Sequence, residues 1–381
     1  MLVSKPPMGW NSWNTFAWKV NEQIIMETAD AMVATGLKDA GYEYVVIDDE
    51  WAERKRDANG RLVPDAGKFP HGIKYLADYV HSLGLKFGMY SCAGIKTCAD
   101  YPGSFDHEFV DAETFAEWGV DFLKYDYCYF PTNADPRARY NRMSMALKAT
   151  GRDILFSACN WGNDMVEEWI RSTGAHMYRS TGDIGERFSA IANIAKSQYG
   201  MWRYAGPGCY NDMDMLVCGM DGEGLVGHPG LCGDTEYKSH FALWCIAGSP
   251  LMMGNDIRKI RKETLELLTN KDLLKINADP QCHAPIVMYV HTPDQPTLFK
   301  HLSDNTFALG FFNFTDGKGG ADLRPWDMGL PTTAGFGLKL REVFTGEVVD
   351  YVDDYFKVSL DAHDCKVYIG EYVEKQNNRK E

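Results

Sequence analysis

The sequence predicts a (β/α)8 barrel followed by an antiparallel β-sandwich. Strand-like and helix-like segments alternate about eight times over roughly the first 270 residues, which is the size and rhythm of such a barrel. Polar side chains follow nearly every predicted strand, as they do where a closed ring of strands carries its site at one end. A doubly wound open sheet is the alternative, but it would gather its ligand groups at one switch point. We expect the barrel over residues 1–278 and the sandwich over residues 279–381.

The predicted barrel elements follow one another in order, beginning with a strand-like segment at 8–13. In the first predicted helix, Ile25, Ala29 and Met32 recur at helical spacing. We expect helices over 22–39, 72–83, 112–118, 138–149, 164–172, 186–198, 237–244 and 258–269. We expect strands over 42–47, 85–90, 120–123, 153–157 and 176–178. The segments 211–216 and 246–253 complete the eight-fold pattern.

After about residue 279 the pattern changes to short β-rich runs separated by Gly, Pro, Asp and Asn. The runs are 284–290, 297–301, 306–314, 338–344 and 365–369. This pattern of short runs and turn residues is typical of an antiparallel sandwich. The region carries few converging polar motifs, so we expect it to stabilise or cover the barrel.

Composition excludes several classes of partner. The chain has 381 residues and a net charge of −14, which disfavours binding to nucleic acid or to anionic membranes. No apolar run is long enough to cross a bilayer, and the N-terminus has no apolar signal core. We therefore expect a cytoplasmic protein, or a secreted one if a signal was removed. A homo-oligomer is left open.

Charged residues stand at the ends of successive predicted strands. One acidic residue there is typically a helix cap, but a set of eight is hard to explain as caps. The set is Asp48, Asp49, Lys124, Asp126, Arg179, Asp183, Asp212 and Asp214. The ten histidines and ten cysteines show no zinc-type spacing, so we propose no metal and no cofactor. Two carboxylates in one pocket without a metal indicate glycoside hydrolysis.

Asp126 is the predicted nucleophile. The buried strand that begins at residue 120 ends in Lys124 and Asp126, and a neighbouring cation keeps a carboxylate ionised. A purely structural ion pair is the alternative. Asp183 is the predicted acid/base. We expect Arg179 to hold a sugar hydroxyl rather than to lower the pKa of Asp183.

These residues lie within motifs that resemble family 27 of the glycoside hydrolases, the α-galactosidases and α-N-acetylgalactosaminidases. The matching motifs are Pro7-Met-Gly-Trp-Asn-Ser-Trp13, Gly41-Tyr-Glu-Tyr with Ile47-Asp-Asp49, Lys96-Thr-Cys98 with Pro102-Gly-Ser, Lys124-Tyr-Asp126 and Asn211-Asp212 with Asp214-Met215. They extend through the predicted barrel, and the trailing β-rich region agrees with the family as well.

The resemblance implies a retaining mechanism with Asp126 as nucleophile and Asp183 as acid/base. It implies that a terminal sugar contacts Trp13, Asp48, Asp49, Tyr90, Lys124, Arg179 and Asp214. The pair Asp48 and Asp49 is expected to bind the axial 4-hydroxyl and the 6-hydroxyl, which would favour galactose over glucose. Cys98 and Cys128 match a pair that is disulfide-linked in secreted relatives. In a cytosolic protein they would instead be thiols at the edge of the sugar, and both interpretations stay open.

The predicted activity is that of an exo-acting α-galactosidase on terminal α-galactosyl groups. Asn160 can hydrogen-bond a 2-hydroxyl, and Asn163 is not small enough to open an obvious acetamido pocket, so we favour galactose. An α-N-acetylgalactosaminidase on the same scaffold is the alternative, and a galactose-binding protein without catalysis is a remote one. Tyr127 stands where many relatives carry Gly, and we expect it to shape the rim.

Overall fold

A computed structural model of the chain describes residues 2–290, 292–331, 333 and 335–375. The chain forms two compact units. The first unit contains Met1–Glu186, Pro207–Leu231 and Ser249–Thr269. The second contains Arg187–Gly206, Cys232–Gly248 and Asn270–Glu381. The domain boundary predicted at residue 278 stays a prediction.

The first unit is built on eight parallel strands in the order β7-β6-β5-β4-β3-β2-β1-β8. A parallel bridge between Leu216 and Met253 joins the segment after β7 to β8 and closes the ring. The strands are β1 (Met8–Asn11), β2 (Tyr44–Val46), β3 (Lys86–Cys92), β4 (Phe122–Asp126), β5 (Leu155–Cys159), β6 (Met177–Arg179), β7 (Tyr210–Asp212) and β8 (Leu251–Met253). The predicted barrel is confirmed.

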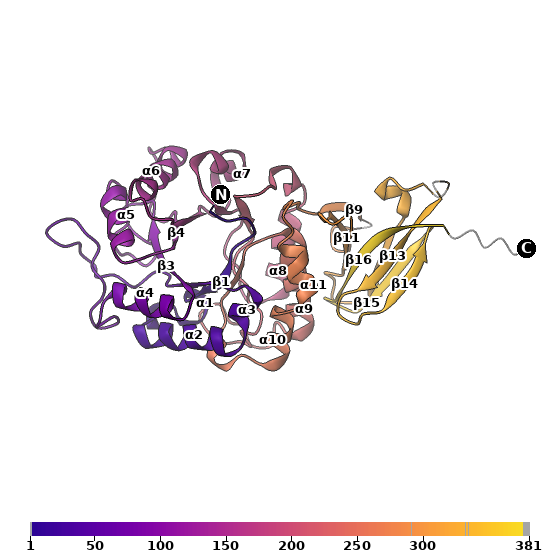
Figure 1. Cartoon of the computed structure of the whole chain (residues 1–381), viewed down its shortest axis with the longest axis horizontal. Coiled ribbons are helices and arrows are strands. Elements are labelled where there is room, and N and C mark those ends of the chain that lie inside the picture. The colour runs from indigo at the N-terminus through magenta and orange to yellow at the C-terminus, as the bar shows by residue number, and fades with distance from the viewer. Residues whose placement is uncertain (1, 291, 332, 334, 376–381) are drawn as a thin grey trace, which may run out of the picture. The chain divides into compact units, whose positions relative to one another are not determined.

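Helices lie along the outside of this ring, as α2, α4, α5 and α6 show in Figure 1. The helices of the first unit are α1 (Trp13–Phe16), α2 (Glu22–Ala34), α3 (Leu37–Ala40), α4 (Ile73–Ser82), α5 (Glu108–Glu117), α6 (Pro136–Ala149), α7 (Val166–Trp169) and α10 (Lys262–Leu268). Short 3-10 turns add Ala17–Lys19, Asn163–Met165, Ile170–Thr173 and Ile257–Lys259.

Three predicted helices are broken, and the backbone explains each break. The helix predicted over 258–269 divides into a 3-10 turn and α10, because Ile260 and Arg261 have ψ of 132° and 152°. The helix predicted over 22–39 divides into α2 and α3 because Gly36 adopts a left-handed conformation, with φ of 79°. The helix predicted over 164–172 is wrong as one element, because Asp164 and Met165 have φ of 60° and 52°. At the start of α6 the expected helix signals are present: the side chain of Asp135 caps the helix, and Pro136 occupies its first turn.

The second unit combines three helices with an antiparallel β domain. Its helices are α8 (Phe188–Ser197), α9 (Asp234–Ala247) and α11 (Lys271–Asn277), with 3-10 turns at Met201–Tyr204 and Pro325–Met328. The strands are β9 (Ile286–Val290), β10 (Pro296–His301), β11 (Phe307–Phe312), β12 (Gly319–Leu323), β13 (Phe336–Glu342), β14 (Val348–Val352), β15 (Phe356–Leu360) and β16 (Cys365–Glu374).

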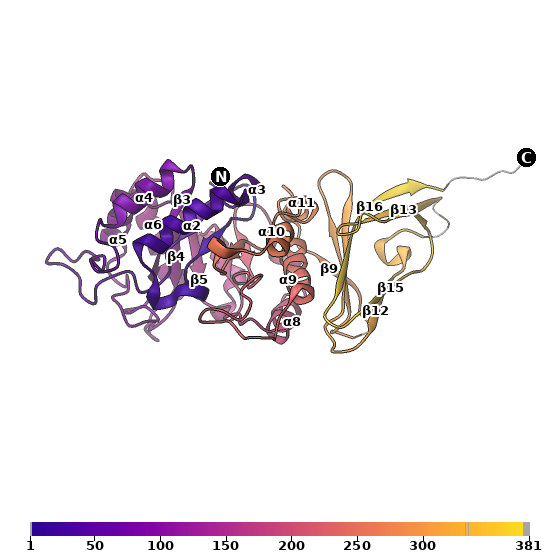
Figure 2. The same cartoon turned by 90° about the horizontal axis from the view of Figure 1, so that it is seen from below.

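Six of these strands form one sheet in the order β14-β13-β16-β11-β10-β9, and β12 pairs with β15. Figure 2 shows β12 and β15 apart from β13 and β16. Buried Phe307, Leu309, Phe311, Leu338 and Leu340 pack in the core of this domain. The prediction of a sandwich is confirmed, although α11, β12, β14 and β15 were not predicted.

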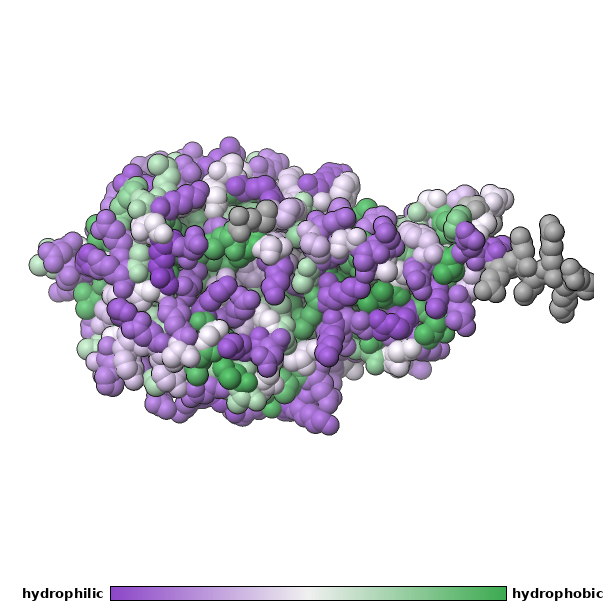
Figure 3. All heavy atoms as spheres, viewed as in Figure 1, coloured by the Kyte–Doolittle hydropathy of each residue, from purple (hydrophilic) through white to green (hydrophobic). Residues whose placement is uncertain are grey.

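The surface is mostly hydrophilic on the face shown in Figure 3, with hydrophobic residues scattered among polar ones. Within the part of the chain that the structure describes, no helix combines the length and apolar character needed to cross a membrane.

Candidate active site

A cavity of about 100 Å³ lies at the carboxyl ends of the barrel strands. It is lined by Trp13, Asn14, Asp48, Asp49, Tyr90, Cys98, Lys124, Asp126, Cys159, Trp161, Arg179, Asp183, Ile184, Asp214, Met215 and Val226. Of the predicted site residues, Cys128 and Asn160 are not in this set, nor is Asp212, whose Oδ1 accepts from the N–H of Asp214 at 2.9 Å. A larger groove of about 540 Å³ lies against α5 and α6, but it contains none of the predicted residues.

One wall of the cavity, which we name the first wall, consists of Asp48, Asp49, Tyr90, Lys124 and Asp126 at the ends of β2, β3 and β4. Lys124 Nζ donates to Asp48 Oδ2 at 2.7 Å, and Asn11 Nδ2 donates to the same oxygen at 2.7 Å. Both partners of the ion pair are largely buried, with side-chain exposures of 16% and 3%. The direct partner of Lys124 is therefore Asp48, whereas the sequence suggested Asp126.

Asp49 is held by backbone groups rather than by a cation. The N–H groups of Glu50 and Ala99 donate to its two carboxylate oxygens at 2.7 and 2.9 Å. Burial nevertheless raises the pKa of Asp49 to about 6, against the opposing effect of these hydrogen bonds. Asp49 is thus ionised at neutral pH, but it takes up a proton more readily than an exposed Asp.

Asp126 is only 5% exposed. The N–H of Tyr127 donates to its Oδ1 at 2.9 Å, while Cys98 Sγ lies 3.7 Å from Oδ2. Burial raises the pKa of Asp126, and the neighbouring charge of Lys124 opposes that rise without cancelling it. The prediction that Lys124 lowers the pKa of Asp126 was right about the direction of the lysine's effect but wrong about the net result, because desolvation is the larger effect.

The opposite wall, which we name the second wall, consists of Arg179, Asp183 and Asp214 at and beyond the ends of β6 and β7. Arg179 donates from Nη2 to Asp183 Oδ1 and pairs through Nη1 with Asp214 Oδ1, each at 2.7 Å. The guanidinium fork of Arg179 thus reaches both carboxylates, while its predicted role as a ligand of a sugar hydroxyl stays a prediction.

The two acids of the second wall differ in burial. The Asp183 side chain is 80% exposed, whereas that of Asp214 is 8% exposed. Burial raises the pKa of Asp214 to about 6, although Arg179 opposes the shift. The N–H of Ile184 donates to Asp214 Oδ2 at 2.7 Å and ties this acid to the segment that carries Asp183.

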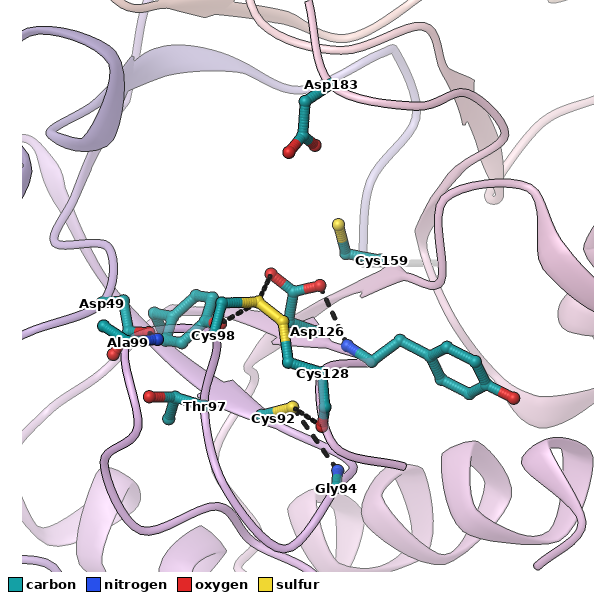
Figure 4. Close-up of a disulfide and its surroundings, with 12 residues drawn as sticks. Asp49, Cys92, Gly94, Thr97, Cys98, Ala99, Asp126, Cys128, Cys159 and Asp183 are labelled. Atoms are coloured by element: carbon teal, nitrogen blue, oxygen red, sulfur yellow. Dashed lines mark hydrogen bonds between the residues drawn. A yellow bond between two sulfur atoms is a disulfide. The ribbon is translucent and has the colours of Figure 1, made fainter. Parts of the chain in front are cut away.

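Asp126 and Asp183 face each other across the cavity. Figure 4 shows the carboxylate of Asp183 directed toward that of Asp126, with Cys159 to one side. One acid comes from β4 and the other from the segment that follows β6, so the closed ring of strands brings them together. This arrangement places two carboxylates on opposite sides of a bound group.

A disulfide between Cys98 and Cys128 borders the nucleophile candidate (Figure 4). It links the loop after β3 to the residue pair that follows Asp126. Gly94 lets these loops pack closely, since a Cβ there would overlap the carbonyl oxygen of Cys128. Cys92 Sγ donates to that same oxygen at 3.1 Å. The disulfide interpretation is the one that the structure supports.

Asn160 does not line the cavity and is fully buried. Its Nδ2 donates to the carbonyl oxygen of Asn163 at 2.7 Å, and Asn163 Nδ2 donates back at 2.9 Å. Side chains alternate along an extended strand, so Asn160 lies on the opposite face from Ser157 and Cys159. Cys159 and Trp161 reach the cavity on either side of Asn160.

Six lining residues were not predicted: Asn14, Cys159, Trp161, Ile184, Met215 and Val226. Strand alternation was a usable signal for Cys159, which ends β5 two residues after Ser157 on the same face. Ile184 and Met215 each follow a predicted acid directly. Val226 lies in a glycine-rich loop whose sequence carries no signal for this position.

Two family models match the chain. The model described as "Alpha galactosidase A" matches residues 5–279, and the one described as "Alpha galactosidase C-terminal beta sandwich domain" matches residues 292–369. The α-galactosidase of Cyamopsis tetragonoloba is 42% identical over 369 residues, covering 97% of this chain and 86% of that protein.

Solved structures agree. One from Bacteroides fragilis has a TM-score of 0.90 at 41% identity and covers 96% of this chain and 79% of that one. The α-galactosidase from Saccharomyces cerevisiae, solved with raffinose, has a TM-score of 0.88 at 26% identity, covering 97% and 98%. Both similarities extend over the barrel and the β domain.

Proposed function

The chain belongs to the α-galactosidase A family of glycoside hydrolases, and from this premise we propose that it is a retaining, exo-acting α-galactosidase. The observation that carries the proposal is the pair Asp126 and Asp183, which face each other across one small cavity. The proposed substrates are terminal α-D-galactosyl groups of oligosaccharides or glycoconjugates. Raffinose is a natural first candidate, since a relative was solved with it.

In the first step, Asp126 attacks the anomeric carbon while Asp183 protonates the departing oxygen. The N–H of Tyr127 holds Oδ1 of Asp126, so we assign the attack to Oδ2. A covalent galactosyl ester forms as the glycosidic bond breaks. In the second step, Asp183 removes a proton from water, the water oxygen attacks the same carbon, and Asp126 departs.

Asp183 donates a proton in the first step, yet its Oδ1 accepts from Arg179 Nη2 at 2.7 Å. We propose that a sugar hydroxyl takes over this contact with Arg179 when substrate binds. That exchange would free Asp183 Oδ1 to face the glycosidic oxygen, and it keeps the predicted role of Arg179 as a sugar ligand.

Selection of galactose follows from the first wall. Asp48 and Asp49 are buried, fixed acceptors, and two such carboxylates suit the axial 4-hydroxyl and the 6-hydroxyl of galactose. An equatorial 4-hydroxyl would point away from these acceptors and lose its hydrogen bond to them, which disfavours glucose.

A second candidate activity, on α-N-acetylgalactosaminides, is favoured by one observation. Asn160 does not line the cavity, so the predicted partner of the 2-hydroxyl is missing. The substituent at carbon 2 of the sugar would then contact other lining residues. Cys159 and Trp161, the sequence neighbours of Asn160, are two of them.

A substrate panel tests both candidates. Purified protein is assayed on p-nitrophenyl α-galactoside, its 2-acetamido analogue, p-nitrophenyl β-L-arabinopyranoside and raffinose. We expect the highest kcat/KM on the α-galactoside among the three aryl glycosides, with release of galactose from raffinose. Turnover of the acetamido analogue alone would instead support the second candidate.

The compartment in which the protein acts stays a prediction. A disulfide is typical of oxidising compartments, and Cys98–Cys128 therefore favours the secreted alternative over the cytoplasmic one.

A further inference from the structure

We propose that reduction of the Cys98–Cys128 disulfide creates a site for a thiophilic divalent cation such as Zn²⁺, formed by the two thiolates and Asp126. The sulfur atoms of both cysteines and a carboxylate oxygen of Asp126 all lie within 4.8 Å of one another. While the disulfide is intact its sulfurs are poor ligands, because metal binding needs thiolates. The site is therefore conditional on the redox state of this one bond.

The geometry suits a tetrahedral ion. Zinc binds thiolate sulfur at about 2.3 Å and carboxylate oxygen at about 2.0–2.2 Å, which places neighbouring ligand atoms about 3.3–3.8 Å apart. Cys98 Sγ already lies 3.7 Å from Asp126 Oδ2, and the two cysteine Cα atoms are 5.1 Å apart. Three protein ligands leave a fourth position for water or an inhibitor.

Both cysteines are held in place by contacts that do not depend on the disulfide. On the Cys98 side, the N–H of Ala99 donates to Asp49 at 2.9 Å, and the N–H of Ile95 donates to Tyr129 at 3.3 Å. On the other side, Cys92 binds the carbonyl oxygen of Cys128. The reduced thiols should therefore stay close together beside Asp126.

The charge around the cavity favours a cation. Besides Asp126, the carboxylates of Asp48, Asp49, Asp183 and Asp214 line it, against the two cations Lys124 and Arg179. Lys124 is already paired with Asp48, and Arg179 is paired with Asp183 and Asp214. Cys98 is exposed, so both a reductant and an ion can reach the pair.

The chemistry balances with a phosphine as reductant. The disulfide, one phosphine and one water give two thiols and one phosphine oxide. The ion then displaces two thiol protons and binds Asp126 Oδ2. That is the oxygen assigned to attack the sugar, so a bound ion should stop hydrolysis. The loss of activity rests on the proposed function, whereas the binding of the ion does not.

Cobalt is the probe, because Co²⁺ occupies zinc-type sites and thiolate ligation produces a sulfur-to-cobalt charge-transfer absorption. The full chain is reduced with a phosphine, desalted without oxygen and titrated with Co²⁺. We expect about one thiolate-bound ion per chain in reduced protein and none in oxidised protein. Far-ultraviolet circular dichroism checks that the reduced protein stays folded.

Three variants assign the ligands. Cys98→Ser/Cys128→Ser should lose the absorption, whereas Cys232→Ser, which changes a cysteine outside the cavity, should keep it. Asp126→Asn keeps both thiols and should weaken Co²⁺ binding at least about tenfold, since even outer-sphere partners of a metal contribute that much.

The proposal is overturned if reduced protein shows no thiolate–cobalt absorption, or if the double serine variant keeps it. It is equally overturned if reduction unfolds the chain, because the folded protein would then have no such site. In folded wild-type protein, ion binding without loss of hydrolysis would instead count against Asp126 as nucleophile, so the two failures can be told apart.

Discussion

The two walls of the cavity hold their carboxylates in different ways. In the first wall, Asp126 is 5% exposed and fixed by a backbone N–H and a bordering disulfide. In the second wall, the Asp183 side chain is 80% exposed and fixed by one guanidinium. A nucleophile needs a constant position, whereas an acid/base group must exchange protons with the leaving group and with water. The difference in burial thus matches the difference in proposed role.

The largest expected effect comes from the first wall. Asp126→Ala should reduce kcat on p-nitrophenyl α-galactoside by about 10⁴-fold or more, as removal of a covalent nucleophile does. Added azide can then attack the vacated face, so β-galactosyl azide is the expected product. Asp78→Ala, at an exposed acid outside the cavity, is the matched control and should retain activity. Near-normal turnover by folded Asp126→Ala protein would contradict the assignment of Asp126 as the nucleophile.

Asp183→Ala should keep the nucleophile but lose the proton donor, so its activity should depend on the leaving group. We expect a loss of about 10²–10⁴-fold on raffinose, whose leaving group needs a proton, and a much smaller loss on α-galactosyl fluoride. Azide should now yield α-galactosyl azide, because it attacks the covalent intermediate. Product analysis by NMR distinguishes the two azides. If both variants gave the same anomer, the two walls would not have separate roles.

The next effect concerns stability. Lys124→Met leaves Asp48 buried without its cation, which should lower the free energy of unfolding by about 3–5 kcal/mol. Lys74→Met, at the exposed pair with Asp78, should leave it unchanged. Urea denaturation measures both. A Lys124→Met variant as stable as the parent would mean that the charge of Lys124 does not stabilise the first wall.

The smallest expected effect is on pH dependence. Asp49 and Asp214 have pKa values raised to about 6, so both gain protons as the pH falls through that value. A protonated carboxyl accepts hydroxyl donors less well, and galactose binding should therefore weaken below pH 6. An unshifted Asp would hold its charge down to about pH 4. Calorimetric titration with galactose on both sides of pH 6 measures this, and a flat affinity would refute the raised values.

The same two walls show how far the sequence predicts the site. Strand-end positions and family motifs located Asp48, Asp126, Arg179 and Asp183, because a ring of parallel strands brings such residues to one face. The motifs did not reveal which charges pair. Lys124 on β4 bonds to Asp48, which follows β2 on the far side of β3, rather than to Asp126 two residues away, and only the register of the strands decides this.

The position just after β5 limited the prediction in the same way. Asn160 directly follows Cys159, so the alternation of side chains along the strand places it on the other face and it does not line the cavity. In the β domain, β15 alternates strictly between apolar and polar residues and offered a usable signal, but β12 and β14 were missed because their short segments alternate weakly. There the pairing partner, rather than the segment itself, determines the strand.

The stereochemistry of the first product tests the central claim most directly. Wild-type protein hydrolyses p-nitrophenyl α-galactoside in deuterated buffer while NMR follows the anomeric protons from the first turnover. Attack by Asp126 followed by attack of water predicts that α-galactose appears first and mutarotates later. Initial release of β-galactose would mean that water attacks the substrate directly, and it would contradict the role of Asp126 as nucleophile.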